Sequence, residues 1–273
     1  MKYSVLMSVY KKDNADYLKL ALESIYDSQT RKPDEIVVVF DGELTDGLYK
    51  VLDEFRKGKE DVVFYYPQEI NHGLGEALRI GAEKCTGDYI FRMDADDISV
   101  SVRFEKQIAY IEAHPEIDVL GSNIAEFKIS PDEENKRLRV CPQKHDDIVK
   151  MGKKRNPMNH MTVCIKRAAL EMVGGYKHLF LLEDYYLWMR MLANNCVMEN
   201  MSEVLVQVRA GTAMYARRAS KVRLESFKKL HAFMLENHLI NKSEAVINGF
   251  IYRVAYIVPP KVRQFTYEKI LRK

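Results

Sequence analysis

The sequence contains little of what would place it in an extracellular, metal-cluster or membrane-spanning class. It has only 4 cysteines in 273 residues, widely spaced and with no CxxC pair, so neither a disulfide framework nor a cysteine-based zinc site is expected. No apolar run approaches the length of a membrane span, and the N-terminal run is too short for a signal peptide. These absences predict a protein of the reducing cytoplasm.

An excess of charge of one sign is also lacking. The net charge is only +3, which gives no indication of a nucleic-acid partner. Charged residues make up 30% of the chain and hydrophobic residues 47%, the proportions of an ordinary globular protein. A chain of 273 residues is long enough to bury a sizeable core, as one large or two smaller domains.

The first half of the chain alternates strand and helix signals. Residues 35–40 form a largely apolar, β-branched run, which is typical of a central strand in a parallel sheet. Similar signals predict strands at 3–9, 62–66 and 88–93, and helices at 15–27, 45–57 and 75–85. This repeated order predicts an α/β fold with a doubly wound, Rossmann-like, mostly parallel central sheet flanked by helices.

A cluster of acids ends the strand at 88–93. Asp94, Asp96 and Asp97 are three carboxylates within four residues, where they repel one another and require water, cations or hydrogen-bond donors. The carboxyl edge of a parallel sheet is where open α/β folds bind ligands. We therefore expect a hard divalent cation, Mn²⁺ or Mg²⁺, at this edge. The alternative is a solvated acidic turn before the helix that begins near Ser101.

Two further strand exits carry polar groups. Val9 and Tyr10 leave the first strand, and Asp41 leaves the second, where an acid often meets a ribose or a base. Asp41 also begins an Asp-Gly dipeptide, so it can equally open a turn. The segment from Asn71 to Gly73 precedes a helix, and its glycine permits the close approach of a phosphate to the helix N-terminus.

Several motifs occur together in a fixed order. They are Ser8-Val9-Tyr10, Asp41-Gly42, Asn71-x-Gly73, residues 87–97, Arg103 with Gln107, Asn156–Thr162, Gly174-Gly175-Tyr176 and Glu183–Trp188. This series resembles the inverting family 2 glycosyltransferases, in particular the branch that builds bacterial cell-surface polysaccharides. The resemblance covers residues 3–210 approximately.

The resemblance implies a GT-A fold and the metal-dependent transfer of a hexose or N-acetylhexosamine. The donor would be a nucleotide-sugar, most often a UDP-sugar, and the acceptor a saccharide or a lipid-linked oligosaccharide. Asp96, with help from Asp94, would hold Mn²⁺ or Mg²⁺ on the diphosphate, and Asp184 would be the general base. The residues implied in nucleotide-sugar binding are Val9, Tyr10, Asp41, Asn71, Gly73, Arg79, Asp94 and Ala95.

The acid pair Glu183-Asp184 has two interpretations. Acids in the first turn of a helix are ordinary partners of the helix dipole. A carboxylate at a helix N-terminus also stays ionised at neutral pH, as a general base must. Under the second interpretation, Asp184 deprotonates an acceptor hydroxyl as that oxygen attacks the anomeric carbon, and Glu183 lies close to the acceptor.

Three other residues near these motifs also have two interpretations, and Asp97 has one. Trp188 can offer a stacking face to a sugar or belong to the core. His160 can be a ligand or acceptor contact, or a hydrogen-bonded structural histidine. Arg79 can touch the nucleotide or be a surface residue with a packed stem. Asp97, the last of the clustered acids, is expected to contact the acceptor or to support the residues that do.

The domain prediction divides the chain near residue 210. Residues 1–210 are expected to form the transferase domain, with a donor half up to about residue 100 and an acceptor half beyond it. Residues 211–273 are expected to form a basic helical extension. Within it, segment 241–273 has seven basic and two acidic residues, interleaved with aromatics. This composition predicts either a contact with an anionic membrane surface, at the inner face of the cell membrane, or a helical lid with one solvated face.

Two other function classes share parts of this pattern. A sugar nucleotidyltransferase also pairs a Rossmann-like sheet with metal-binding acids, but it would carry a glycine-rich basic N-terminal loop, and residues 8–12 contain no glycine. A non-catalytic nucleotide-sugar-binding subunit need not retain Asp96 and Asp184, and both are present.

Overall fold

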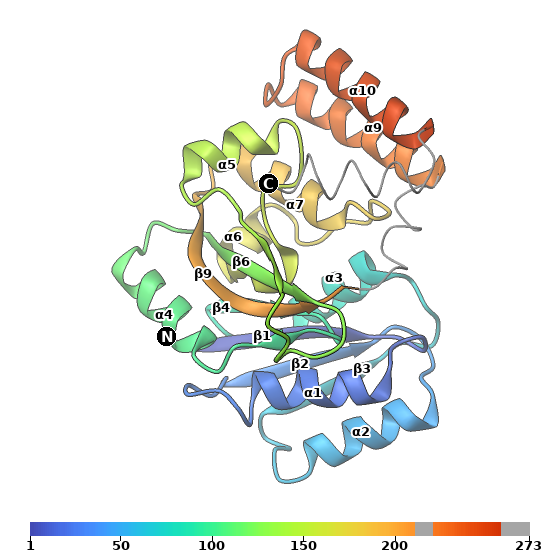
Figure 1. Cartoon of the computed structure of the whole chain (residues 1–273), viewed down its shortest axis with the longest axis vertical. Coiled ribbons are helices and arrows are strands. Elements are labelled where there is room, and N and C mark those ends of the chain that lie inside the picture. Colours follow the sequence, from blue (N-terminus) through green and yellow to red (C-terminus); the bar gives the residue numbers. More distant parts are fainter. Residues whose placement is uncertain (211–220, 258–273) are drawn as a thin grey trace.

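The computed structural model of the chain describes residues 1–210 and 221–257 and places helices around a curled central sheet (Figure 1). The strands are β1 (Tyr3–Val9), β2 (Glu35–Phe40), β3 (Val63–Pro67), β4 (Tyr89–Met93), β5 (Ile98–Ser99), β6 (Val119–Phe127), β7 (Arg137–Arg139), β8 (Cys164–Lys166) and β9 (Met198–Arg209). The helices are α1 (Ala15–Ile25), α2 (Asp46–Arg56), α3 (Leu74–Lys84), α4 (Arg103–Ala113), α5 (His145–Gly152), the 3₁₀ turn η1 (His160–Thr162), α6 (Arg167–Met172), α7 (Glu183–Ala193), α9 (Lys221–Glu236) and α10 (Lys242–Ile257).

The first half of the chain confirms the predicted strand–helix alternation. β1 pairs in parallel with β2 and with β4, and β2 pairs in parallel with β3. No end of the predicted elements in this half differs from the observed end by more than two residues. Every residue of β2 is buried, as expected for a central strand covered on both faces.

The register of these strands brings their exits to one edge. Val9 lies opposite Phe40, and Met7 lies opposite Met93. The residues that follow β1, β2 and β4 therefore emerge at the same carboxyl edge of the sheet, where α/β folds bind ligands. This is the geometry on which the sequence-based site prediction depends.

The second half of the sheet is mixed. β8 pairs antiparallel with both β4 and β6, β5 pairs antiparallel with β9, and β6 pairs in parallel with β9. The full order is β3-β2-β1-β4-β8-β6-β9-β5, with β7 paired to β6 at its side. The α/β class is confirmed, but these antiparallel pairings were not predicted, because a three-residue strand such as β8 is too short to show a periodic pattern.

Two buried polar side chains on α4 fasten that helix to the middle of the sheet. Arg103 donates to the backbone oxygen of Arg92 on β4 at 2.9 Å. Gln107 donates to the backbone oxygens of Leu120 on β6, at 3.1 Å, and of Thr162 in η1, at 3.0 Å. The amide of one glutamine thus satisfies carbonyls on two different elements, β6 and η1.

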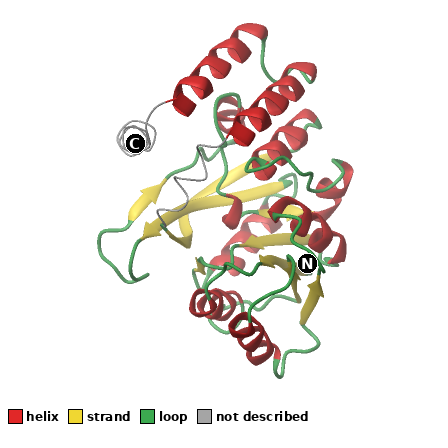
Figure 2. Cartoon of the chain, turned by 90° about the vertical axis from the view of Figure 1, so that its right-hand side faces the viewer, coloured by secondary structure: helices red, strands yellow, loops and turns green. Residues whose placement is uncertain are grey.

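The last described helices, α9 and α10, form an antiparallel pair on the side of the molecule remote from β3 (Figures 1 and 2). Their rings stack where Phe227 meets Tyr252, with ring centroids 3.6 Å apart. The predicted helical extension is therefore present from Lys221 to Ile257, while 211–220 and 258–273 lie outside the described residues. Over the described ranges, no helix combines the length and the apolar character needed to cross a bilayer.

Candidate functional site

The carboxylate of Asp41 organises the loop that precedes α3. Asp41 is only 4% exposed, and it accepts hydrogen bonds from the backbone nitrogens of His72, at 2.7 Å, and Gly73, at 3.0 Å. The side-chain amide of Asn71 adds a third bond at 2.9 Å. The structure therefore brings the predicted residues Asp41, Asn71 and Gly73 together, with the carboxylate engaged by the loop.

Gly42 explains why an Asp-Gly pair stands at this exit. Its φ of +85° lies in the left-handed region, and a Cβ built there would be 2.8 Å from the backbone nitrogen of Asn71. No other residue accommodates both the dihedral and the close approach of the loop without strain. Asp41-Gly42 therefore forms a turn, as one interpretation predicted, and the same turn places Asp41 at the candidate site, as the other predicted.

The N-termini of two helices meet beside this loop. Gly75, in the first turn of α3, is buried so closely against α7 that an added Cβ would lie 2.6 Å from Cγ of Glu183. Unpaired backbone N–H groups and the helix dipole make each N-terminus favourable for a negatively charged ligand. The loop held by Asp41 therefore leads directly to the acid pair at the start of α7.

Arg79 is engaged within its own helix. Its guanidinium contacts Glu76 at 2.7 Å and Glu83 at 2.5 Å, one turn away on either side. These two carboxylates accept the hydrogen bonds that the guanidinium would otherwise donate to a nucleotide. The structure therefore favours the surface interpretation of Arg79 over a nucleotide contact.

The acid cluster after β4 contains a buried cation that the sequence analysis did not single out. Arg92 is only 2% exposed, and its Nη1 lies 2.5 Å from an oxygen of Asp94. Asp96 is exposed at the surface, yet desolvation by the surrounding protein and the charge of Asp94 together raise its pKa to about 6. Arg92 was recognisable as a charged residue inside an otherwise apolar strand.

Three predicted residues of this cluster and its surroundings have buried side chains. Asp97 is 2% exposed and accepts a hydrogen bond from the backbone nitrogen of Arg209 at 3.0 Å, so it fastens the end of β9 rather than facing an acceptor. Burial, with the charges of Asp94 and Asp96, raises the pKa of Asp97 well above its usual range. Val9 and Ala95 are also buried, which leaves only their backbone groups for a ligand.

Asp13 joins the acid cluster from the exit of β1. Its carboxylate accepts a hydrogen bond from the backbone nitrogen of Tyr10 at 2.9 Å. Burial raises the pKa of Asp13 to about 7, and the charges of Asp96 and Asp94 add to the increase. The sequence places Asp13 three residues after Tyr10, but its approach to the β4 exit depends on the pairing of β1 with β4.

Asp184 is held in one orientation by Asn156. The side-chain nitrogen of Asn156 donates to Asp184 at 2.5 Å, and the backbone nitrogen of Tyr185 donates to its other oxygen at 2.7 Å. The backbone nitrogen of Met158 donates to the side-chain oxygen of Asn156 at 3.2 Å, so only the amide nitrogen of Asn156 can face Asp184. Asn156 belongs to the Asn-Pro segment quoted above, where it carried no assigned role.

Burial opposes the ionised state that was expected of Asp184. It raises the pKa of this carboxyl, while the hydrogen bonds from Tyr185 and Asn156 lower it. Glu183 is 9% exposed, and burial raises its pKa to about 7. Leu181, just before the pair, has a φ of +60°, a strained conformation for a bulky residue.

His160 and Trp188 are interior residues. Nε2 of His160 lies 2.9 Å from the hydroxyl of Tyr176, and burial lowers the pKa of the imidazole well below its usual value. Trp188 is fully buried, with its ring 6.0 Å from that of His160. The structural interpretation therefore holds for both residues, and Trp188 offers no exposed face for sugar stacking.

The donor set at this edge fits a metal ion shared with a substrate. Among the described residues, no group of three or more Asp, Glu, His or Cys side chains could enclose an ion by itself. Ions such as Mg²⁺ commonly take one or two carboxylates and complete their coordination with water and substrate phosphates. The crowded carboxylates of Asp94 and Asp96 provide such oxygen ligands.

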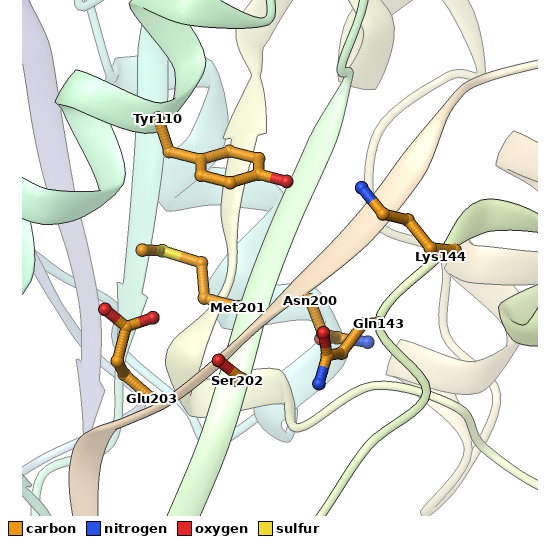
Figure 3. Close-up of a pocket in the computed structure, with 7 residues that line it drawn as sticks. All are labelled: Tyr110, Gln143, Lys144, Asn200, Met201, Ser202 and Glu203. Carbon is orange, nitrogen blue, oxygen red and sulfur yellow. The ribbon is translucent and has the colours of Figure 1, made fainter.

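A separate pocket of about 260 Å³ lies between α4 and β9 (Figure 3). Its lining residues are Tyr110, Gln143, Lys144, Asn200, Met201, Ser202 and Glu203. Tyr110 and Lys144 both hold Glu199, at 2.6 Å and 3.1 Å. None of the predicted site residues lines this pocket, so the candidate site remains the carboxyl edge of the sheet.

Sequence comparison places these motifs in a known context. A model of the family described as Glycosyl transferase family 2 matches residues 4–173. The amylovoran biosynthesis glycosyltransferase AmsE of Erwinia amylovora is 37% identical over 272 residues, which is 98% of each chain. The UDP-Gal:alpha-D-GlcNAc-diphosphoundecaprenol beta-1,3-galactosyltransferase of Escherichia coli is 33% identical over 273 residues, covering 100% of this chain and 97% of that protein.

Solved structures share the fold at lower identity. S. aureus TarS 1–349 in complex with UDP-GlcNAc aligns with a TM-score of 0.68 at 18% identity, over 99% of this chain and 76% of that chain. The chain spans 46% of the longer TarS structure. The mannosyltransferase PcManGT from Pyrobaculum calidifontis, in complex with GDP-Man and Mn2+, aligns with a TM-score of 0.62 at 16% identity, over 98% of this chain and 79% of that one.

Proposed function

Because the chain belongs to glycosyl transferase family 2, we propose that it moves a hexose or N-acetylhexosamine from a UDP-sugar to a saccharide or lipid-linked acceptor, with inversion. Membership of this family makes the chain a glycosyltransferase, and its fold is the GT-A fold. The proposal concerns the donor, the metal, the stereochemistry and the acceptor.

One observation carries the proposal: the loop held by Asp41 packs against the start of α7, where the acid pair Glu183-Asp184 lies. Burial raises the pKa of Tyr176 above its usual range, and the charges of Asp184, in the first turn of α7, and of Asp94, after β4, add to this increase. The loop held by Asp41 reaches the same place through the packing of Gly75 against α7. A donor bound at the strand exits would therefore have its sugar between the metal-binding acids and Asp184.

Asp94 and Asp96 would hold Mn²⁺ or Mg²⁺ in this enzyme. When bound, such an ion neutralises the negative charge that develops on a leaving diphosphate. The Mn2+ named with PcManGT supports this part of the proposal, as do the desolvation and the neighbouring charge of Asp94 that raise the pKa of Asp96 to about 6. The N-terminus of α3 provides a further favourable position for the diphosphate.

Asp184 would accept the proton of the acceptor hydroxyl. As the acceptor oxygen bonds to C1 of the sugar, the bond from C1 to the diphosphate oxygen breaks, and its electron pair leaves with the nucleoside diphosphate. A single displacement of this kind inverts the configuration at C1. The amide of Asn156 keeps the carboxylate oriented throughout.

The names of the relatives support a lipid-linked saccharide as the acceptor. The Escherichia coli relative is named for a GlcNAc-diphosphoundecaprenol acceptor and AmsE for amylovoran biosynthesis. We therefore place this enzyme in bacterial polysaccharide assembly, at the inner face of the cell membrane.

A transfer assay tests the proposal. The full chain is incubated with Mn²⁺, one UDP-sugar from a panel, and a synthetic lipid-diphosphate GlcNAc, and UDP release and product configuration are measured. We expect UDP release with one donor and a product of inverted configuration. We expect Asp184→Asn to lower kcat on the order of a thousandfold and to leave UDP affinity unchanged, because the amide keeps the shape but takes no proton.

Three results would contradict the proposal. Near-normal turnover by the Asp184→Asn variant would place the base elsewhere. Formation of a nucleotide-sugar and pyrophosphate from UTP and a sugar 1-phosphate would indicate a nucleotidyltransferase. Binding of UDP-sugars without turnover, for every donor and acceptor in the panel, would indicate a non-catalytic binding subunit.

A further inference from the structure

The outer face of α10 is apolar and exposed. Its exposed apolar residues are Val246 (72%), Ile247 (57%), Phe250 (67%), Ile251 (54%) and Val254 (41%). With 3.6 residues per turn, these positions fall on one side of the helix and form a continuous apolar stripe. A monomer that exposes an organised apolar face of this kind commonly uses it for binding.

The opposite face of α10 is fixed to the protein. Asn248 donates to the backbone oxygen of Lys153 at 2.7 Å, and the hydroxyl of Tyr252 donates to that of Lys154 at 2.9 Å. Tyr252 also stacks on Phe227 of α9. The orientation of the apolar stripe is therefore determined by these contacts.

Basic residues border the stripe. Lys242 and Arg253 are exposed on α10, four residues before and seven residues after Val246. At this spacing both lie beside Val246 along one edge of the stripe. Lys154 is exposed on the loop that anchors the helix. The 16 residues that follow Ile257 contain five basic side chains and one acid, so positive charge continues beyond the helix.

From this combination we infer that the stripe docks into the interface of an anionic lipid bilayer. An amphipathic helix with an apolar face and Lys or Arg along its border lies in the plane of such an interface, where the apolar side chains insert and the cations meet lipid headgroups. The inference rests on the proposed function in one respect: docking would bring the enzyme to a lipid-linked acceptor. The surface itself is independent of the catalytic residues.

One loop connects the docking surface to the candidate base. Lys153 and Lys154 bind the inner face of α10, and Asn156, two residues further on, donates to Asp184. Docking of α10 at a bilayer would therefore hold the loop that contacts Asp184 close behind the docked helix. The diphosphate-proximal sugars of a lipid-linked acceptor would be presented at this position.

Charge argues against a second copy of the chain as the occupant. Two α10 stripes packed against each other would bring Lys242 and Arg253 close to the basic residues of the partner helix. Like charges across an interface oppose association. An anionic bilayer complements both the apolar stripe and its border.

Vesicle flotation of the full-length protein tests the inference. The probes are phosphatidylcholine vesicles with and without about one quarter phosphatidylglycerol, at low and high salt. The stripe variant is Ile247→Gln with Phe250→Gln. The matched control is Ile129→Gln with Leu138→Gln, which changes two exposed apolar side chains outside α10 (87% and 57% exposed). UDP release in solution is measured for all three proteins.

We expect the wild type and the control to float with anionic vesicles in a salt-sensitive manner, and the stripe variant to bind at least about tenfold more weakly. Equal flotation of wild type and stripe variant would overturn the inference. So would a wild type that ignores vesicles but forms a dimer which the stripe variant loses. If the vesicle result holds but no protein releases UDP from any donor, the proposed function fails and the docking surface stands.

Discussion

At the scale of single residues, the candidate base depends on one neighbour. Two donors lower the pKa of Asp184 against the effect of burial, and Asn156 is the one that a substitution can remove without altering the backbone. The hydrogen bond from Met158 keeps the amide in the donating orientation. Asn156 is therefore a positioning residue for Asp184 in the proposed reaction.

Asn156→Ala should shift the pH dependence of the rate. Loss of the donor raises the pKa of Asp184, and because the base acts only when ionised, the acidic limb of kcat should move to higher pH. UDP affinity should stay unchanged. The measurement is kcat against pH with a saturating donor and acceptor, and Asn237→Ala, at an exposed position just after α9, is the control.

A uniform loss of rate at every pH would contradict this role, since it would indicate damage to the site rather than a change in the base. Removal of the amide cannot move the limb to lower pH under the proposed mechanism. Both outcomes are read from the same pH series.

Asp96 is expected to couple metal binding to pH. Its pKa of about 6 means that the folded protein protonates it below that pH, so Mn²⁺-dependent binding of UDP should weaken between about pH 7 and about pH 5. Asp96→Asn should abolish the Mn²⁺-dependent part of UDP binding in calorimetry, because it removes a charged oxygen from a hard-cation site.

The control for Asp96→Asn is Asp53→Asn, an exposed acid on α2. Unchanged UDP binding with Mn²⁺ by the Asp96 variant would remove it from the metal site. Loss of Mn²⁺-independent binding in the same variant would indicate disturbed folding, which a thermal melt detects.

At the scale of elements, the start of α3 is built by a side chain from β2. Asp41 satisfies the backbone nitrogens of two loop residues and the amide of Asn71, and none of these groups has a regular secondary-structure partner. The position of the helix N-terminus thus depends on a carboxylate that precedes it by more than thirty residues. The loop and the helix end would form the shared part of the donor site, which binds the nucleotide.

Asp41→Ala should weaken UDP and UDP-sugar by the same factor, about tenfold or more, because it releases the loop that would bind their common nucleotide. It should also lower the thermal midpoint, since buried backbone donors lose their acceptor. Calorimetry with UDP and with one UDP-sugar checks the prediction, and Glu43→Ala, exposed on the same turn, is the control. A change in affinity for one sugar alone would contradict it.

Elements with clear periodicity were predictable from the sequence, and those defined by long-range pairing were not. β1 and β2 have the predicted ends because their apolar runs stop abruptly at polar residues. β5 and β8 contain two and three residues and exist only because β9 and β4 pair with them. Short strands of this kind leave no pattern in the sequence.

The same distinction applies to the candidate site. The acid clusters were visible as charge at strand and helix ends, and the register of β1, β2 and β4 places those ends at one edge. Asp13, Arg92 and Asn156 were missed as site residues because their partners lie elsewhere in the chain. Burial alone decided between the two interpretations of Trp188, and no local pattern reports burial.

At the scale of the whole molecule, the candidate site joins two parts of the chain. The strands from β1 to β4 form one side, and α7, η1 and the loop before them form the other. The pair α9–α10 is fastened to this second side through Lys153 and Lys154. The proposed acceptor, which docking at a bilayer would deliver, thus approaches from the side that carries the base.

The three-residue strand β8 limits the order in which the strands of the sheet can pair while the chain is being translated. β6 is translated well before β8, yet in the part of the chain that the structure describes its connection to β4 within the sheet runs through Cys164–Lys166. The strands from β1 to β4 can pair as soon as Met93 has left the exit tunnel, whereas β6 has the short β7 as its partner until β8 and then β9 have been translated. A nascent chain paused between residues 139 and 164 therefore presents β6 paired with the three-residue β7 and otherwise without neighbours, although β6 is buried along its whole length in the finished protein. Chaperone binding is expected to be most useful at this stage of synthesis.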